Sequence, residues 1–245
     1  RPTKELANLL EKLAIALANP GPREASVRAA MNGGVGGSTH AASLMAALAV
    51  GAGQYGGGHE VFLLLQLWEK CQFDIEKWKH NLSNPNDDHQ EDIWLPIEHA
   101  PGFDPNGVDC PVITQQTLSA LESVNPGSAL TWVSENRQLL ESHLGYPLAM
   151  SGVAAAAFYD LEFNNHQATM LYLMLRLPGA AVHGRQRRGP SGRLTRAAVQ
   201  SPGCCRVHRH GVSRPEHHPH RRHVPLFLAG TPLQRQTVQH DYIAG

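Results

Sequence analysis

The feature that most constrains the fold is the stretch of residues 29–62, in which small residues at helical spacing lead into a glycine-rich loop and then a second helix. Helices rich in alanine can approach one another closely, because little side chain separates their backbones. Small residues recur at residues 154–157, where four alanines follow one another. We therefore expect close-packed helices, in the centre of a large helical domain or in a dimer interface.

Apolar residues recur at helical spacing along most of the first 183 residues. A helix is predicted over residues 3–18, where Pro20 and Pro22 end it. Further helices are predicted over residues 25–31, 38–50, 60–80, 114–123, 127–144, 147–163 and 166–177, with a break at the glycines of residues 33–37. No segment alternates apolar and polar residues as a strand does. The predicted fold class is mainly α.

The chain changes character after His183. Residues 1–183 carry 10 lysines and arginines against 19 acids, whereas residues 184–245 carry 11 arginines against two acids and no lysine. The later segment has no sustained apolar period, so it is expected to be disordered. A second hypothesis is a shifted reading frame over about residues 184–230, because a GC-rich gene read out of frame encodes such Arg, His, Pro, Gly and Cys enrichment.

We therefore expect a helical domain over residues 1–183 and a tail over residues 184–245. Because residue 1 is arginine rather than methionine, the domain is expected to be a fragment or trimmed at its N-terminus. No apolar run approaches the roughly 18–20 residues that a membrane span needs. No signal peptide is evident, and the four cysteines form no disulfide framework. The expected location is cytoplasmic, with no membrane partner.

Two motifs point to other functions. Residues 51–56, GAGQYG, match the glycine pattern of dinucleotide-binding loops, but a helical segment precedes them where that fold needs a strand. In the tail, Cys204 and Cys205 are adjacent, without the spacing that lets two thiolates share one zinc ion. The arginines of the tail would contact phosphates without sequence specificity. We expect no nicotinamide cofactor, no metal site and no specific nucleic acid, and a protein that binds metal or nucleic acid through the tail remains a third-choice function.

Several segments occur in the same order as landmarks of the citrate synthase superfamily, over roughly residues 3–183. Residues 53–60, GQYGGGHE, resemble the family turn GPLHGGA, and residues 101–105, PGFDP, followed by Asp109, resemble GFGHP…DPR. Residues 146–152, YPLAMSG, stand where members carry PLNVDG. Residues 18–21 and 26–33 are similar to two earlier regions, and residues 176–183 to a late R-x-x-G-x-x-A-H helix. The length fits the short, citryl-CoA lyase-like members.

The resemblance implies a citrate synthase-like helical domain that pairs with a second copy through helices packed across a two-fold axis. It implies that the substrates are an acyl-CoA and a small 2-oxo acid, and that a carbon–carbon bond between them is formed or cleaved. The activity is that of an acyltransferase or a lyase, and coenzyme A enters as a thioester substrate, with no cofactor. In such members an aspartate removes a proton from the acyl methyl, and two histidines stabilise the enol oxygen and polarise the ketone.

The positions that carry this chemistry in the family are substituted here. Ser151 stands at the aspartate position, Gly56 and about Pro105 at the two histidine positions, and Pro20 at that of a substrate-binding histidine. His59 would replace a missing histidine if the glycine loop folds back. Asp104 is the first candidate for a displaced base.

The predicted catalytic residues are His59, Asp104 and Ser151. The predicted substrate-binding and CoA-binding residues are Gly56, Gly57, Gly58, Glu60, Gly102, Phe103 and Arg176. The alternative interpretation is that His59 and Glu60 cap a helix, and that Asp104 and Asp109, in the irregular segment of residues 99–111 (the second loop), are solvated turn residues. The alternative function is a non-catalytic homologue that serves as a dimeric binding or regulatory subunit.

Overall fold

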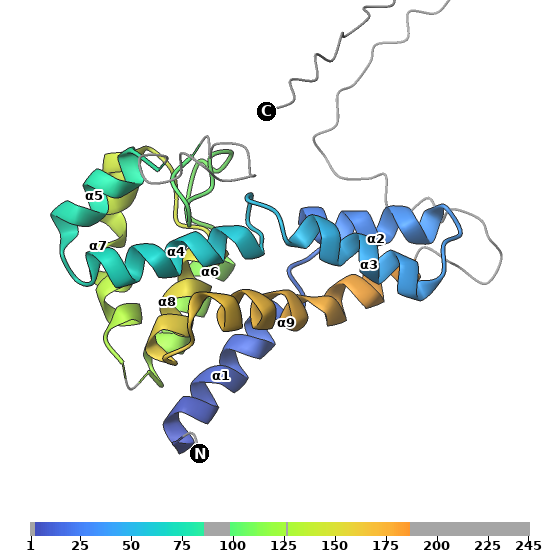
Figure 1. Ribbon diagram of the computed structural model, residues 1–245, viewed down its shortest axis with the longest axis horizontal. Helices are drawn as coiled ribbons and strands as arrows, with labels where there is room; N and C mark the ends of the chain where they lie inside the picture. Colours follow the sequence, from blue (N-terminus) through green and yellow to red (C-terminus); the bar gives the residue numbers. More distant parts are fainter. Residues whose placement is uncertain (1–2, 86–98, 126, 187–245) are drawn as a thin grey trace, which may run out of the picture. The chain divides into compact units, whose positions relative to one another are not determined.

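The computed structural model describes residues 3–85, 99–125 and 127–186, which form nine helices and no strand (Figure 1). The helices are α1 (Lys4–Leu17), α2 (Ala25–Val35), α3 (His40–Gly51), α4 (Gly58–Cys71), α5 (Ile75–Ser83), α6 (Val112–Glu122), α7 (Ala129–Leu144), α8 (Met150–Asp160) and α9 (Asn165–Gln186). The predicted mainly α class is confirmed. The predictions for residues 187–245, including the shifted frame and the Cys204–Cys205 pair, lie outside the described residues.

Helices α2, α3 and α9 pack against one another, and glycines make the approach close. The break predicted at the glycines of residues 33–37 falls at Gly36 and Gly37, because α2 continues through Gly33 and Gly34 to Val35. A Cβ on Gly33 would meet Ser43 Oγ at 2.9 Å, and one on Gly34 would meet the carbonyl oxygen of Gly184 at 2.1 Å. The packing of α2 on its neighbours therefore outweighs the low helix propensity of glycine.

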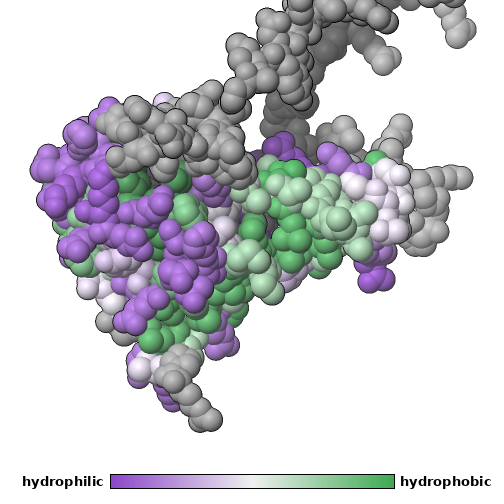
Figure 2. Space-filling view, viewed as in Figure 1, coloured by the Kyte–Doolittle hydropathy of each residue, from purple (hydrophilic) through white to green (hydrophobic). Residues whose placement is uncertain are grey.

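Helix α9 also runs further than predicted, because it passes through Pro178 and ends at Gln186. Proline removes one backbone hydrogen bond, but the contacts of α9 with α2, α3 and α4 hold the helix on both sides of it. Apolar residues gather over α3 and α9 in the space-filling view (Figure 2). Met45 of α3 and Met170 and Met174 of α9 are each at least 60% exposed.

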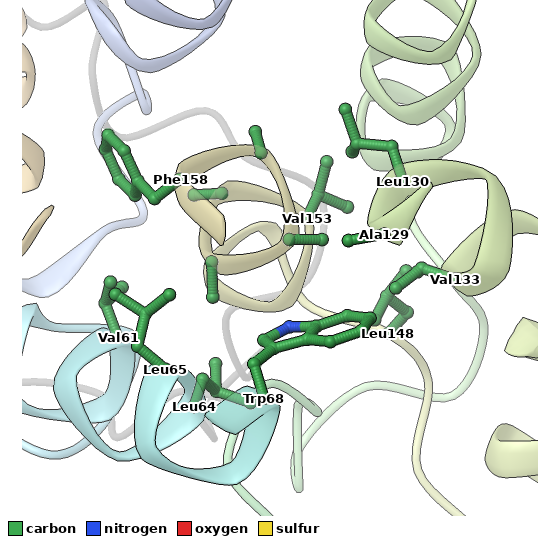
Figure 3. Packing of buried hydrophobic residues seen from close by; sticks show 14 of the residues in the cluster. Val61, Leu64, Leu65, Trp68, Ala129, Leu130, Val133, Leu148, Val153 and Phe158 are labelled. Carbon is green, nitrogen blue, oxygen red and sulfur yellow. The ribbon is translucent and has the colours of Figure 1, made fainter. Parts of the chain in front are cut away.

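Helix α8 is the most buried element of the described chain. Its residues 153–158 are all fully buried. Figure 3 shows α8 between Val61, Leu65 and Trp68 of α4 and Leu130 and Val133 of α7. The four alanines at residues 154–157 add little side chain between these helices, as the sequence predicts for a close-packed centre.

The helix predicted over residues 60–80 is divided into α4 and α5. Gln72 has a positive φ of 49°, and Asp74 caps α5 by accepting hydrogen bonds from the N–H groups of Glu76 and Lys77. The turn brings the ring of Trp78 to 4.8 Å from that of Trp68. Packing of these two aromatic rings therefore favours two short helices over one long one.

The loop that follows His99 is held against the start of α8 by main-chain contacts. The N–H of Ala149 donates to the carbonyl of Gly102 at 2.8 Å, and the N–H of Asp104 donates to the carbonyl of Pro147 at 2.9 Å. Phe103 and Leu148 form an isolated antiparallel bridge between these two segments. The contacts fix this second loop beside Ser151, the second residue of α8.

None of the helices in the described part of the chain has the length and apolarity that a membrane crossing requires. Within the same residues, no group of three His, Cys, Asp or Glu side chains could hold a metal ion. The cytoplasmic location stays a prediction from the sequence.

Replacing Gly102 by alanine tests how tightly this second loop is packed. Gly102 has a φ of +84°, and a Cβ there would meet Leu64 Cδ2 at 3.0 Å and Gly152 Cα at 3.2 Å. We expect Gly102→Ala to lower the free energy of unfolding in urea by about 2–4 kcal/mol. Gly145 is the matched control, because its φ is +74° and nothing lies within 4 Å of its Cβ position. Its alanine variant should cost about 1 kcal/mol, and equal costs at both positions would contradict the close packing.

Candidate functional site

A cavity of about 420 Å³ lies where three segments that are far apart in the sequence meet. The glycine loop and the start of α4 contribute Tyr55, Gly56 and Glu60. The second loop contributes His99, Phe103, Asp104 and Pro105, and the first turn of α8 contributes Met150 and Ser151. The wall also includes Tyr172 and Arg176 of α9, together with Arg23, Glu24, Ala25 and Arg28. The three segments that resemble the superfamily's landmarks thus border one space.

Glu60 lies at the centre of this meeting point, with 1% of its surface exposed. Its Oε1 accepts a hydrogen bond from the N–H of Gly102 at 2.6 Å and another from the hydroxyl of Ser151 at 2.8 Å. Its Oε2 accepts from the N–H of Gly56. One carboxyl group therefore links the glycine loop, the second loop and α8.

Burial raises the pKa of Glu60 from 4.5 to about 7. Loss of hydration disfavours the carboxylate, and this effect outweighs the hydrogen bonds from Gly102, Ser151 and Gly56 and the positive charge of Arg176, all of which lower the pKa. Glu60 therefore changes its charge near neutral pH, which suits a group that takes up and returns a proton.

His99 is a titratable neighbour of Glu60 in the cavity wall. Its Nε2 lies 4.0 Å from Glu60 Oε2, and the side chain is 3% exposed. The ring of Tyr55 stacks on the imidazole with centroids 5.1 Å apart and planes inclined by 16°. The stacking fixes the plane of the imidazole at the edge of the cavity.

Arg176 organises the glycine loop from α9. Its guanidinium donates to the carbonyl of Gly56 at 2.9 Å and forms an ion pair with Glu24. The hydroxyl of Tyr172 donates to the same carbonyl at 3.0 Å, and the guanidinium lies 4.6 Å from the centre of the Tyr172 ring. Burial raises the pKa of Tyr172 to about 12, so this hydroxyl stays protonated and remains a donor.

Charged groups also stand at the rim of the cavity. Arg23 and Arg28 are exposed side chains that line it from the beginning of α2. Asp104 lines the cavity from the second loop and is half-buried. Its Oδ1 accepts the N–H of Asn106 at 2.9 Å, the arrangement of an Asx turn. The rim therefore offers two guanidinium groups to an anion that enters.

The structure brings six of the ten predicted site residues to the cavity wall, namely Gly56, Glu60, Phe103, Asp104, Ser151 and Arg176. The other four lie nearby. Gly57 caps α4, Gly58 packs on Thr169 and Leu173, and Gly102 donates its N–H to Glu60. The ring of His59 stacks on that of Phe62 at 6.1 Å and does not line the cavity. The functional roles of all ten remain predictions.

The sequence-based prediction omits Glu24, Tyr172 and the rim arginines, and it places His99 in the second loop, within reach of the cleft, without a role. Of these residues, only Tyr172 could have been inferred from the sequence, because it precedes Arg176 by four residues and thus shares its helix face. Glu24 pairs with a residue 152 positions away, a relation that no local spacing contains. His99 begins the second loop and has no motif of its own.

The stability of a Glu60→Gln variant should depend on pH in a way that reports this carboxyl. Between about pH 4.5 and 7 the folded protein holds the proton of Glu60 and the unfolded chain releases it. The stabilising contribution of Glu60 is thus fully present below pH 4.5 and is lost as pH rises through 7. The free energy of unfolding of the variant, minus that of the wild type, should rise by about 2–3 kcal/mol from pH 5 to 8.

Urea unfolding at several pH values measures this difference. Glu69→Gln, at an exposed position of α4, is the control whose difference from the wild type should not vary. A constant difference for Glu60→Gln as well would show that this carboxyl has an ordinary pKa in the folded protein.

No family model matches the sequence, and no curated protein matches it significantly. Solved structures do. The citryl-CoA lyase of Hydrogenobacter thermophilus is similar with a TM-score of 0.58 and 18% identity, over 89% of this chain and 81% of that one. An ATP citrate lyase of Methanosaeta concilii in complex with (3S)-citryl-CoA gives 0.60 and 16%, over 79% of this chain and 33% of that one.

A citrate synthase of Thermoplasma acidophilum, in a ternary complex with carboxymethyl coenzyme A and oxaloacetate, gives a TM-score of 0.54 and 16% identity. The match covers 89% of this chain and 56% of that one. At these identities the likeness concerns the fold. The all-helical structure of the described residues accords with it. The chain has a citrate synthase-like fold, as the resemblance of its sequence landmarks implied.

Proposed function

We propose that the protein forms or cleaves a carbon–carbon bond between an acyl-CoA and a small 2-oxo acid, with catalytic residues that differ from those of the family. The observation that carries the proposal is the convergence of the glycine loop, the second loop and Ser151 on one cavity. If these segments served unrelated functions, they would not need to meet at one cavity. An acyl-CoA site and a 2-oxo acid site must meet, because the two reacting carbons have to touch.

The charges of the cavity suit these substrates. A 2-oxo acid carries at least one carboxylate, and coenzyme A carries phosphates. Arg23 and Arg28 at the rim supply guanidinium groups, which can bind such anions in a bidentate way. A volume of about 420 Å³ is within the range of small-molecule sites.

The chemistry also needs a base that works near neutral pH. Among the described residues, the carboxylates that line the cavity are Glu24, Glu60 and Asp104. Glu24 is paired with Arg176. Although Ser151 stands at the position of the family's aspartate, Glu60 and Asp104 remain as acids in the same cavity. This supports an active enzyme over a non-catalytic binding or regulatory subunit.

The similar solved structures support the same reaction class. One is a citryl-CoA lyase, another holds (3S)-citryl-CoA, and a third holds a coenzyme A derivative with oxaloacetate. We carry the acyl-CoA and the 2-oxo acid over to this chain as proposed substrates. Coenzyme A enters as a thioester substrate, and the direction of the reaction, transferase or lyase, stays open.

We also propose that the protein is a homodimer. Three exposed methionines, Met45, Met170 and Met174, lie on α3 and α9, where apolar surface gathers in Figure 2. Such surface favours contact with another protein, and a second copy fits the alanine-rich helices beside it. Analytical ultracentrifugation tests this, and a monomer at micromolar concentration would contradict it.

Calorimetric titration tests the proposed function. We expect acetyl-CoA to bind with micromolar affinity, and to bind more tightly when oxaloacetate is present, because the two sites share one cavity. Arg28→Ala should weaken binding about tenfold, the effect of losing one charged hydrogen bond. Arg137→Ala is the control, since Arg137 pairs with Glu141 on α7 and does not line the cavity.

Condensation is followed in the same samples by mass spectrometry of the CoA thioester product. A wild-type protein that binds neither ligand, or binds both without forming or cleaving a carbon–carbon bond, would contradict the proposal. In the second case the non-catalytic alternative would take its place.

A further inference from the structure

We propose that Glu60 and His99 form the acid–base pair of this site. Glu60 exchanges the proton on the α-carbon of the acyl thioester, and His99 exchanges the proton on the oxygen of the 2-oxo acid. The assignment rests on the proposed function and makes it specific. It differs from the sequence-based prediction, which placed His59 and Asp104 in these roles.

The first argument concerns Ser151, which stands at the position where family members carry an aspartate. A serine side chain is short, and it leaves space for a carboxyl group from another element. The carboxyl of Glu60 fills that space from α4, with Ser151 Oγ donating to its Oε1 at 2.8 Å. The chain thus retains a carboxylate at this point of the cavity, supplied by a different helix.

The second argument is that the carboxyl of Glu60 is oriented. Gly102 and Ser151 donate to Oε1, and Gly56 donates to Oε2. A group fixed by two loops and a helix loses little entropy when it meets the substrate. Ser151 is in this account a positioning residue, because it acts through Glu60.

The third argument separates Glu60 from Asp104. Asp104 is half-buried and its Oδ1 accepts the N–H of Asn106 within a turn. Glu60 is 1% exposed and lines the same cavity. A carboxylate shielded from water is a stronger base toward a carbon acid than one that water solvates. The raised pKa of Glu60, about 7, agrees with this assignment.

The fourth argument concerns His99. Its Nε2 lies 4.0 Å from Glu60 Oε2, and stacking on Tyr55 holds its ring in one plane. Both residues line the cavity, so a substrate can contact each of them. His59, the histidine that the sequence favoured, lies against Phe62 outside the cavity wall.

The proposed step balances in protons and electrons. The Glu60 carboxylate takes a proton from the α-carbon, and the electron pair of that C–H bond forms the enolate. The enolate carbon attacks the ketone carbon, and the ketone oxygen takes a proton from the His99 imidazolium. Glu60 then returns its proton to His99 across the 4.0 Å that separates them, directly or through one water. Cleavage follows the same steps in reverse.

Several charged or titratable groups face the carboxyl of Glu60. His99 approaches from the second loop, and Arg176 and Tyr172 approach from α9. Glu24 lies beyond Arg176, and Asp104 lines the far wall. Only the ionised form of Glu60 can accept the proton, so the rate of proton exchange at the α-carbon should rise with pH to a plateau, with a midpoint near 7.

The test separates the two proton transfers. Wild-type protein is incubated with acetyl-CoA in heavy water together with malate, which occupies the site of the 2-oxo acid but offers no ketone for attack. Mass spectrometry follows deuterium in the acetyl group. With oxaloacetate in place of malate, mass spectrometry of the citryl-CoA formed follows the complete reaction.

We expect Glu60→Gln to lower both the exchange and the complete reaction by at least 100-fold, the usual effect of losing a general base. His99→Gln should lower the complete reaction by a similar factor and leave the exchange within about threefold. Ser151→Ala should slow exchange about tenfold and shift its pH midpoint upward, because one hydrogen bond to the carboxylate is lost. Glu69→Gln and His80→Gln, at exposed positions of α4 and α5, are the matched controls and should behave as wild type.

Glu60→Asp provides a second variant if Glu60→Gln fails to fold, since it keeps a carboxylate and withdraws it from the α-carbon. It should reduce exchange about tenfold or more while acetyl-CoA still binds. Exchange at the wild-type rate in Glu60→Gln or in Glu60→Asp would overturn the assignment and leave the proposed function standing. Loss of exchange in Asp104→Asn with an active Glu60→Gln would give the base to Asp104. A wild-type protein with no exchange and no complete reaction would end the proposed function and this assignment together.

Discussion

The buried carboxyl of Glu60 is the contact on which the site depends. It accepts hydrogen bonds from Gly56, Gly102 and Ser151, and so connects a loop, a second loop and a helix that lie far apart in the sequence. Without it, these buried donors would lack an acceptor, at a cost of about 1–3 kcal/mol for each one left unsatisfied. The same burial gives Glu60 a pKa near 7, so the group that assembles the cavity is also suited to proton transfer within it.

Most helices could be predicted from local patterns. Apolar spacing and prolines defined α1, and Thr39 caps α3 by accepting the N–H of Ala42. The differences arise where packing outweighs propensity. Trp78 turns back onto Trp68 and divides the helix predicted over residues 60–80, and close approach to Ser43 keeps α2 helical through Gly33. Such contacts join residues of different helices, so the local sequence pattern contains no signal for them.

The order of the sequence landmarks identified the three segments that form the cavity. It could not assign the side chains within them. His59 and Glu60 are neighbours, and on a helix they point about 100° apart, so one faces Phe62 and the other the cavity. Which of the two faces inward depends on how α4 packs against α8 and α9. The partners of Arg176 and the approach of His99 are likewise products of the tertiary structure.

The most direct test of the central claim is a carbon-13 NMR titration of protein labelled at the carboxyl carbon of glutamate, between pH 4 and 9. One resonance should titrate with a midpoint near 7 and should be missing from the spectrum of Glu60→Gln. That result would establish a buried, ionisable carboxyl at the centre of the site. If every glutamate resonance titrates below about pH 5.5, Glu60 is an ordinary carboxylate, and the account of the site is wrong.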